Sequence, residues 1–323
     1  MHRRERVLSA SSAVNDSMPR CNAGQARSRV LLLMVLSAGP VPVAAQTAPP
    51  AILSLPGSVR SAGLHGAGAA LVGDAGAVFA NPAGIATLRR IGLEGTYRGT
   101  RFNAVAGTGA LAWRLSQFDL GVGLAYVGGD SIPLVGLSRG PGGRPYEAMG
   151  VGSLVYRFGM IAFGGSIREV RRSAGGGVER GRSGDLGIAL AVFDIMAIGF
   201  SMQNVGGNWR SQSVLPMPRL TRWGFTMNYT DPQETFRLMT TLEAQWPEGQ
   251  PSRWILGGEA GVVVYAVGLL GRAAYQTRTA GTAEPAFTLG GSAALARVQL
   301  DYAYAARDLV GARAHRLGFR LTL

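Results

Sequence analysis

Apolar residues alternate with small or polar residues over most of this chain, from Ile91 to Leu323, in segments of about ten residues. Because successive side chains of a β-strand point to opposite faces, this pattern is typical of strands that are apolar on one face and polar on the other. Fourteen such segments can be marked, with ends good to about 2 to 4 residues. They are residues 91–99, 103–114, 117–128, 146–157, 160–171, 181–192, 195–205, 219–229, 235–246, 252–261, 263–276, 285–294, 297–306 and 313–323.

The connections between these segments alternate in length. Those after odd-numbered segments are mostly long and rich in Gly, Pro and Ser, the longest being 129–145 and 206–218. Those after even-numbered segments leave room only for tight turns, as at Phe158-Gly159, Phe193-Asp194 and Leu295-Ala296. Bacterial outer-membrane barrels have an even number of antiparallel strands, with long loops outside and short turns in the periplasm. The pattern therefore predicts an all-β fold, a transmembrane antiparallel β-barrel of about 14 strands in the bacterial outer membrane.

Strand parity sorts the side chains of this barrel into two faces. In the segment 297–306, Val298 and Leu300 share one side, whereas Gln299 and Asp301 share the other. We predict that the following charged side chains face the lumen: Glu94, Arg98, Asp119, Asp185, Arg222, Glu243, Glu259, Arg272, Asp301, Arg316 and Arg320. Their mixed signs favour a network of ion pairs that stiffens the barrel, with a substrate-selecting ring as the alternative.

Two other folds fit parts of the pattern. The stretches Leu186 to Phe200 and Ile255 to Leu270 are apolar enough to suggest membrane helices, but they contain Asp194 and Glu259. A carboxylate at mid-membrane costs about 2.5 to 3.5 kcal/mol, whereas hairpins place Asp194 in a turn and Glu259 in the lumen. A soluble β-sandwich would also alternate, but it would bury its apolar face. Aromatic residues near the segment ends favour the membrane barrel, whose interfaces they would line: Tyr97, Trp113, Tyr126, Tyr156, Tyr229, Trp246, Trp254 and Tyr275.

The N-terminal part has the three regions of a secretory signal peptide. Arginines precede an apolar run from Val30 to Leu36, and small residues end at Val43-Ala44-Ala45. The run is too short to span a membrane as a helix, so we expect cleavage after Ala45. Met18 precedes a more typical signal sequence, which makes residues 1–17 a candidate start-site artefact. The predicted organisation is a signal peptide in 1–45, an N-terminal lumen segment in 46–90 and a barrel in 91–323.

Charge and cysteine content narrow the partners. The net charge is +13, and residues 1–45 account for +4 of it through six arginines against Glu5 and Asp16, which leaves +9. All basic residues are arginines, scattered one or two per segment and not in the clusters of a nucleic-acid site, so outer-membrane lipid is the expected partner. The single cysteine, Cys21, precedes the predicted cleavage site, so the barrel has no disulfide framework.

No residue pattern points to catalysis. His65 and His315 have no neighbours at metal-ligand spacing, and no serine lies in the Gly-x-Ser-x-Gly context of a nucleophile elbow. An outer-membrane lipase need not use that motif and stays as the enzymatic alternative. In Gly66-Ala67-Gly68 the third glycine of a dinucleotide loop is replaced by Leu71, and close packing explains these glycines better. We therefore expect a protein that is not an enzyme and uses no metal and no cofactor.

Short motifs before and within the barrel segments resemble the PorV/PorQ family. Those before the barrel are Ala62-Gly63, Gly66-Ala67-Gly68, Ala70-Leu71, Asp74-Ala75, Phe79 and Asn81-Pro82-Ala83-Gly84, and those within it include Asp185-Leu186-Gly187, Gln203-Asn204-Val205-Gly206-Gly207 and Leu300-Asp301-Tyr302-Ala303-Tyr304. That group is similar to the FadL family of hydrophobic-compound transporters. The resemblance implies a fourteen-stranded barrel with an N-terminal segment in its lumen.

The resemblance leaves the function open between two classes. FadL-like proteins transport small hydrophobic molecules across the outer membrane, and we prefer this function for the present chain. PorV-like proteins serve type IX secretion and bind exported protein cargo or subunits of the secretion system, which is the alternative. A barrel with a purely structural role is a third possibility, which does not come from the resemblance.

Residues 61–90 are predicted to form an internal gate that enters from the periplasmic end. The gate motif comprises Asp74, Phe79, Asn81, Pro82, Ala83 and Gly84. Pro82 fixes its own φ and restricts Asn81, so the motif would set the angle at which the segment meets the first strand. A plain turn before the barrel is the alternative. At the other end, 129–145 is expected to be extracellular and mobile, because its composition offers little apolar surface to offset the entropy of ordering.

Overall fold

The computed structural model describes residues 48–99, 104–132, 136–138, 143–173, 177–193, 195–207, 215–233, 235–277, 285–306 and 313–323. Residues 47–323 form one compact unit. The predicted signal peptide in 1–45 lies outside the described residues, and so does the candidate start-site artefact in 1–17. Asp194, predicted to lie in a turn, is also outside them.

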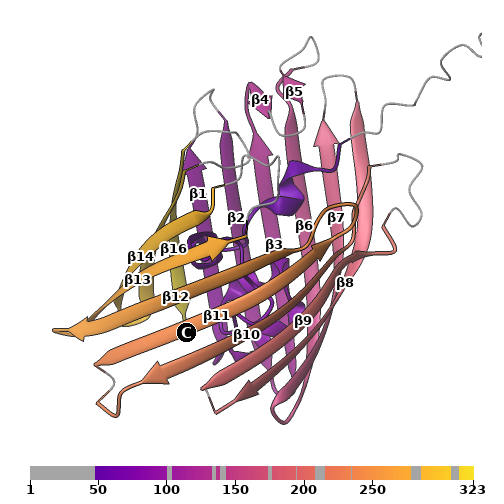
Figure 1. The fold of residues 1–323 in the computed structure, drawn as a ribbon. Helices are drawn as coiled ribbons and strands as arrows, with labels where there is room; N and C mark the ends of the chain where they lie inside the picture. Colours follow the sequence, from indigo (N-terminus) through magenta and orange to yellow (C-terminus); the bar gives the residue numbers. More distant parts are fainter. Residues whose placement is uncertain are drawn as a thin grey trace, which may run out of the picture. The chain divides into compact units, whose positions relative to one another are not determined.

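Fourteen antiparallel strands close into a barrel, in which each strand pairs with its neighbours along the chain and β1 pairs with β16 (Figure 1). The strands are β1 (Ile91–Gly99), β2 (Val105–Leu115), β3 (Phe118–Gly128), β6 (Tyr146–Phe158), β7 (Ile161–Ser173), β8 (Val178–Val192), β9 (Met196–Val205), β10 (Leu220–Thr230), β11 (Phe236–Pro247), β12 (Arg253–Val264), β13 (Val267–Gln276), β14 (Phe287–Leu295), β15 (Val298–Ala305) and β16 (Ala314–Thr322). The predicted fold class is confirmed, and the strand ends lie within four residues of those predicted.

Tight turns connect the strands at one end of the barrel. In the turn between β12 and β13, Tyr265 and Ala266 have φ values of 47° and 68°. Positive φ at both central residues is the geometry of a two-residue turn whose twist matches that of the strands. The two stretches that could suggest membrane helices are the β8–β9 and β12–β13 hairpins instead. Among the described residues, no helix is long and apolar enough to cross a membrane.

The register separates the two faces of the barrel wall. On β15, the side chain of Leu300 is 61% exposed on the outer face, whereas Asp301 is 6% exposed on the lumen side. Outer side chains are apolar because they meet lipid, and the polar positions turn inward. All eight aromatic residues that the sequence places near the membrane interfaces are exposed: Tyr97, Trp113, Tyr126, Tyr156, Tyr229, Trp246, Trp254 and Tyr275.

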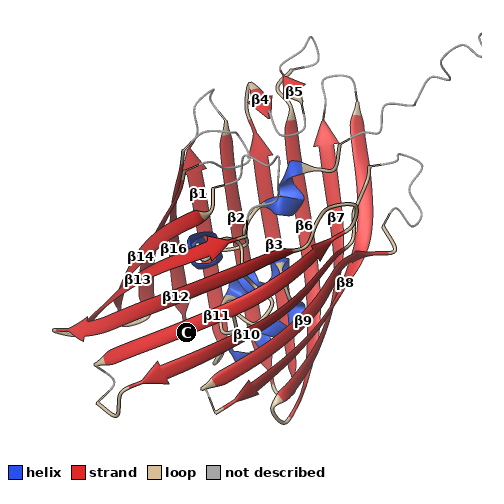
Figure 2. Cartoon of the chain, viewed as in Figure 1, coloured by secondary structure: helices blue, strands red, loops and turns tan. Residues whose placement is uncertain are grey.

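Residues 48–90, here called the plug, fill the lumen. Their short helical turns are η1 (Ala51–Ser54), α2 (Val59–Gly63), η2 (Ala75–Phe79) and η3 (Pro82–Thr87), and Figure 2 shows them in blue within the ring of red strands. The plug contacts strands around the ring, with α2 on β14, β15 and β16, η2 on β2 and β3, and η3 on β7 and β8. The predicted lumen segment is therefore present.

The direction of the plug differs from the prediction. Its first described residues lie at the end of the barrel with the long loops, where Arg172 donates to the Ala48 carbonyl at 2.7 Å and the Ile52 amide donates to Glu147 at 2.7 Å. The plug thus runs from the long-loop end to the short-turn end, where β1 begins. The expectation of entry from the periplasmic end is wrong for the described residues, because Ile52 and Leu55 are apolar and bury themselves beneath the loops.

The described residues of the loop 129–145 include a short hairpin that the sequence pattern did not predict. A two-stranded hairpin pairs β4 (Ser131–Ile132) with β5 (Leu137–Ser138), next to the barrel rim in Figure 1. Ile132 is fully buried in the same hydrophobic cluster as Ile52 and Met149. The expectation overlooked this isoleucine, whose burial offsets part of the ordering entropy.

The plug packs directly against backbone at glycines of the wall. A Cβ atom added to Gly199 of β9 would lie 1.8 Å from the carbonyl oxygen of Ala69, and one added to Gly224 of β10 would lie 3.0 Å from the Ala69 Cβ. Only glycine permits this approach. The inward-facing glycines of the strands therefore shape the lumen to the plug.

Replacement of Gly199 by alanine should displace the plug while leaving the barrel intact. We expect a several-fold rise in conductance in planar bilayers, because the new methyl group occupies the place of the Ala69 carbonyl. The control is Gly152→Ala, on the outer face, where an added Cβ meets nothing within 4 Å. Equal conductance of the two variants would show that the plug tolerates the methyl group and that this contact does not hold it.

Labelling of cysteines can establish which end of the barrel is outside. Gly177 lies in the β7–β8 connection, at the end of the barrel with the long loops, and Gln233 lies in the β10–β11 connection, at the end with the tight turns; both are exposed. In intact cells, a maleimide on a polymer too large for porins should label Gly177→Cys and should reach Gln233→Cys only after the outer membrane is opened. The reverse labelling pattern would invert the topology.

Candidate functional site

Arg60 and Asp74 form an ion pair within the plug, with Nη1 and Oδ2 3.2 Å apart. They are the only charged residues between positions 46 and 88. Both are buried, at 6% and 4% exposure. A buried charge is stable only when it is paired, so these two side chains must find partners on the wall as well.

The wall supplies those partners from β1, β12, β13, β15 and β16. Arg60 also reaches Glu259 through Nε, at 2.8 Å, and Arg320 reaches Asp74 through Nη1, at 2.9 Å. Glu94 pairs with Arg320, its direct cross-strand neighbour. Arg272 joins Glu259 at 3.3 Å to Asp301 at 3.0 Å. We call this set the ionic cluster: Arg60, Asp74, Glu94, Glu259, Arg272, Asp301 and Arg320.

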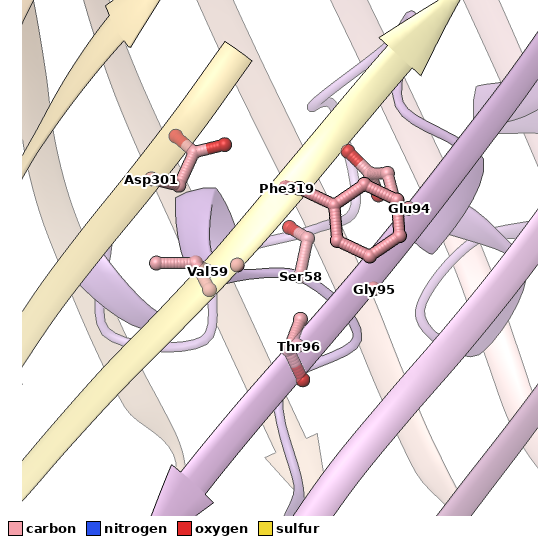
Figure 3. Close-up of a pocket in the computed structure, with 8 residues that line it drawn as sticks. Ser58, Val59, Glu94, Gly95, Thr96, Asp301 and Phe319 are labelled. Atoms are coloured by element: carbon pink, nitrogen blue, oxygen red, sulfur yellow. The ribbon is translucent and has the colours of Figure 1, made fainter. Parts of the chain in front are cut away.

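Two members of the ionic cluster, Glu94 and Asp301, lie where the plug meets the β15–β16–β1 wall (Figure 3). Ser58 and Val59 of the plug face Glu94, Thr96 and Asp301 there, with essentially no free volume between them. A Cβ added to Gly318 would lie 2.6 Å from Val59 Cγ2. The contact is therefore tight as well as charged.

Asp74 stays ionised in this setting. Burial alone would raise the pKa of its carboxyl, but the guanidinium groups of Arg320 and Arg60 outweigh burial and hold the pKa below its usual value. A depressed pKa means that the ion pairs are at full strength above the ordinary aspartate pKa of about 3.9 and weaken as the pH falls toward the lower folded value. Asp74 thus holds the plug throughout the neutral range.

A second set of contacts fastens the middle of the plug to β10 and β11. Glu243 accepts hydrogen bonds from the amides of Gly68 and Ala69, each at 2.7 Å. Arg222 donates to the Gly66 carbonyl at 2.9 Å and pairs with Glu243 at 3.1 Å. These plug residues have no polar side chains, so the wall recognises their backbone.

A third set holds Phe79 at the end of η2. Arg168 donates to the Phe79 carbonyl at 3.1 Å and pairs with Asp185 at 2.8 Å. Gln203 donates to the same carbonyl at 2.6 Å. Asp185 lies at a β-bulge between β8 and β9, where it also accepts from the Asn204 amide at 2.8 Å. The extra residue of the bulge lies on β9, where Asn204 has a φ of 59°, and Asp185 keeps the inward parity of β8.

Asn81 links two parts of the plug to the wall. Its side chain caps η3 by accepting from the Ala83 amide at 3.1 Å, and it donates to the carbonyls of Ala69, at 2.6 Å, and of Ile188 on β8, at 3.2 Å. Pro82 occupies the first turn of η3, where a missing amide proton costs nothing. The motif therefore does more than the plain turn of the alternative interpretation.

The opposite side of the plug is apolar. One continuous hydrophobic cluster, here called the apolar seam, joins plug residues to β2, β3, β6, β7 and β8 and to the loops above. From the plug it includes Ile52, Leu55, Val78, Phe79, Ile85 and Leu88; from the wall it includes Ala106, Ala110, Ala112, Ala125, Val127, Met149, Val151, Val155, Ala162, Val170 and Ala189; from the loops it includes Ile132, Leu215 and Met217. It extends along the lumen from the long loops to the start of β1.

The structure places every predicted site residue in or facing the lumen. Of the charged set, Glu94, Arg98, Asp119, Asp185, Glu243, Glu259, Arg272, Asp301 and Arg316 are buried, and Arg222 and Arg320 are half-buried. The gate-motif residues Asp74, Phe79, Asn81, Pro82, Ala83 and Gly84 are all buried in the plug. Asp119 pairs with Arg157 near the short turns.

Sequence reasoning missed several members of these contacts. Arg168 and Arg172 share the inward parity of β7, so the period-2 pattern could have found them. Glu147, which pairs with Arg172 at 2.9 Å, follows the same rule on β6. Arg60 lies outside the strands, and its signal was its isolation as the one cation near Asp74. Among the described residues, no three His, Cys, Asp or Glu side chains are grouped as a metal site requires.

Asp74→Asn should loosen the plug and spare the barrel. The change leaves Arg60 and Arg320 with less negative charge in a buried site, and removal of one partner from a buried pair costs about 3 to 5 kcal/mol. Hydrogen exchange should show faster exchange at plug amides and unchanged protection of the strands. The control is Asp231→Asn, in an exposed turn where Asp231 accepts from the Phe236 amide at 2.6 Å. Unchanged plug protection in Asp74→Asn would contradict the anchoring role.

Comparison with known proteins identifies the fold but no family. No family model and no curated protein sequence matches the chain. Among solved structures, the ΔS2 mutant of the TodX monoaromatic hydrocarbon channel has a TM-score of 0.57 at 12% identity, over 83% of this chain and 99% of that chain. The Pseudomonas putida toluene transporter TodX has a TM-score of 0.52 at 11% identity, over 81% of this chain and 96% of that chain.

A FadL homologue from Pseudomonas aeruginosa has a TM-score of 0.53 at 11% identity, over 82% of this chain and 98% of that chain. These comparisons support the FadL side of the sequence resemblance, and none of them supports PorV/PorQ. The chain has the fold of the FadL-type outer-membrane barrels.

Proposed function

We propose that this protein lets small hydrophobic molecules cross the bacterial outer membrane and that the plug is its gate. The observation that supports the proposal best is the apolar seam, which extends between the two ends of the lumen. A barrel lumen that is open to water is normally polar. A continuous apolar lining on one side of a filled lumen is what a hydrophobic ligand requires.

The two sides of the plug differ in how easily they separate from the wall. On the side of the ionic cluster, separation would break the Arg60–Glu259 and Arg320–Asp74 pairs and leave buried charges with fewer partners. On the side of the apolar seam, Arg168 and Glu147 bind the backbone of Phe79 and Ile52, but most contacts are apolar. A hydrophobic ligand can replace those apolar contacts, because burial of apolar surface is not directional. We therefore assign the route to the seam and the anchor to the ionic cluster.

The structural neighbours agree with this proposal. TodX is described as a monoaromatic hydrocarbon channel and a toluene transporter, and it has the same fold. The proposal includes outer-membrane lipid as the surroundings of the barrel, and it needs neither a catalytic step nor a cofactor. The alternative of a secretion component that binds exported proteins has no support from the comparisons.

Narrowing the seam should slow the uptake of a hydrophobic probe. Ala125 of β3 lies in the seam at 6% exposure, whereas Ala260 of β12 is exposed on the lipid face. Overpacking a filled interior costs roughly 1 to 3 kcal/mol, so Ala125→Phe should reduce the rate of toluene entry into cells by about tenfold. Ala260→Phe should leave the rate unchanged.

The amount of folded barrel in the outer membrane, measured by its heat-modifiable mobility on gels, corrects for expression of each variant. Equal toluene entry through Ala125→Phe and the unmodified protein, at equal amounts of barrel, would exclude the seam as the route.

A further inference from the structure

A recess of about 490 Å³ opens at the short-turn end of the lumen, next to the start of β1 and the β14–β15 turn. Its polar lining is dominated by arginine: Arg89, Arg90, Arg297 and Arg320, with Gln299 and Thr322. None of the described residues that line it has an acidic side chain. We call this cavity the mouth recess.

The arginines of the mouth recess differ in their surroundings. Arg89, Arg90 and Arg297 are exposed. Arg320 is only 14% exposed in its side chain and is held by Asp74 and Glu94 of the ionic cluster. The recess therefore has a solvated rim and a deeper arginine that is shared with the anchor of the plug.

The carboxylates that contact the lining residues are engaged deeper in the lumen. Asp74 and Glu94 pair with Arg320, and Asp301 pairs with Arg272 and accepts from Gln299. Guanidinium groups match the geometry of phosphate and bind it through paired hydrogen bonds. Several of them around one cavity suit a group with more than one negative charge.

We propose that the mouth recess is a binding site for a phosphate group and that its occupant competes with Asp74 for Arg320. A phosphate that enters from the short-turn side meets Arg89, Arg90 and Arg297 first and Arg320 behind them. Nη2 of Arg320 has no hydrogen-bond partner among the described residues and can donate to the phosphate, whose negative charge then shares the guanidinium with Asp74 and weakens the pair that holds the plug. Phosphate binding at the mouth and loosening of the plug are thereby linked through one side chain. Either a free organic phosphate or the headgroup of an anionic phospholipid carries the required group.

Titration calorimetry of the full barrel in a neutral detergent tests the site, with phenyl phosphate as the probe. Loss of charge-assisted hydrogen bonds should weaken binding by about tenfold or more in the double variant Arg89→Gln/Arg297→Gln. The matched control is Arg171→Gln/Arg182→Gln, which removes two exposed arginines that bind Glu169 on β7. Equal weakening in both variants, or in neither, would overturn the proposed site.

Folding and ligand source need separate controls. Arg89→Lys/Arg297→Lys keeps the charge but not the paired hydrogen bonds, so its affinity should lie between those of the unmodified protein and the glutamine variant. A lysine variant as weak as the glutamine variant would point to misfolding as the cause of the loss, and heat-modifiable mobility on gels would show it. Nanodiscs of phosphatidylglycerol or phosphatidylcholine distinguish the two sources. Weaker phenyl phosphate binding in phosphatidylglycerol alone identifies the lipid headgroup, and equal binding in both identifies a free phosphate.

A bilayer recording tests the link to the plug. Phenyl phosphate added on the short-turn side should raise conductance several-fold, and the same addition on the long-loop side should not. Binding that leaves the conductance unchanged on both sides would overturn the competition for Arg320, although toluene entry along the seam would be unaffected. The failure of this inference is thus distinct from the failure of the proposed function.

Discussion

The burial of charge inside the lumen is the constraint on which the rest of this structure depends. Strands whose outer face meets lipid must turn their polar residues inward, and a charge buried there needs a partner. Plug and wall share those partners: Glu259 is paired with both Arg60 and Arg272, and Asp74 lies between Arg60 and Arg320. Displacement of the plug on this side would therefore remove counter-charges from the wall.

The plug depends on the wall for its backbone as well as for its charges. Its helical turns are short, so many of its amides and carbonyls have no partner within the plug, and buried backbone groups require one. Carboxylates of the wall, such as Glu243 and Glu147, accept from plug amides, and Arg168 donates to a plug carbonyl. This explains why small residues suffice in the plug: the wall recognises its main chain, and the glycines of the wall let it approach.

The sequence predicts those parts of the structure that local periodicity determines. The period of two along each strand determines where strands lie, which face each side chain takes and which charges point inward. This alternation does not depend on which strand is the partner. The path of the plug does not, because it rests on contacts such as that of Ile52 with Glu147, which lies 95 residues away. Arg60 was missed for the same reason, since its partner Glu259 is 199 residues distant. The burial of Ile132 in a loop likewise depends on residues that no local pattern connects to it.

On the proposed function, a plug held mainly by ion pairs on one side and mainly by apolar contacts on the other separates two requirements of an outer-membrane channel. The lumen must stay closed to water and ions, and it must open for a ligand. An apolar constriction excludes ions because they would lose their hydration shell there, whereas a hydrophobic ligand gains by entering. On the proposed function, the ionic cluster holds the plug in register while the seam parts, so the plug need not leave the barrel. Selectivity for apolar molecules would then follow from the lining of the route itself and require no preformed binding pocket.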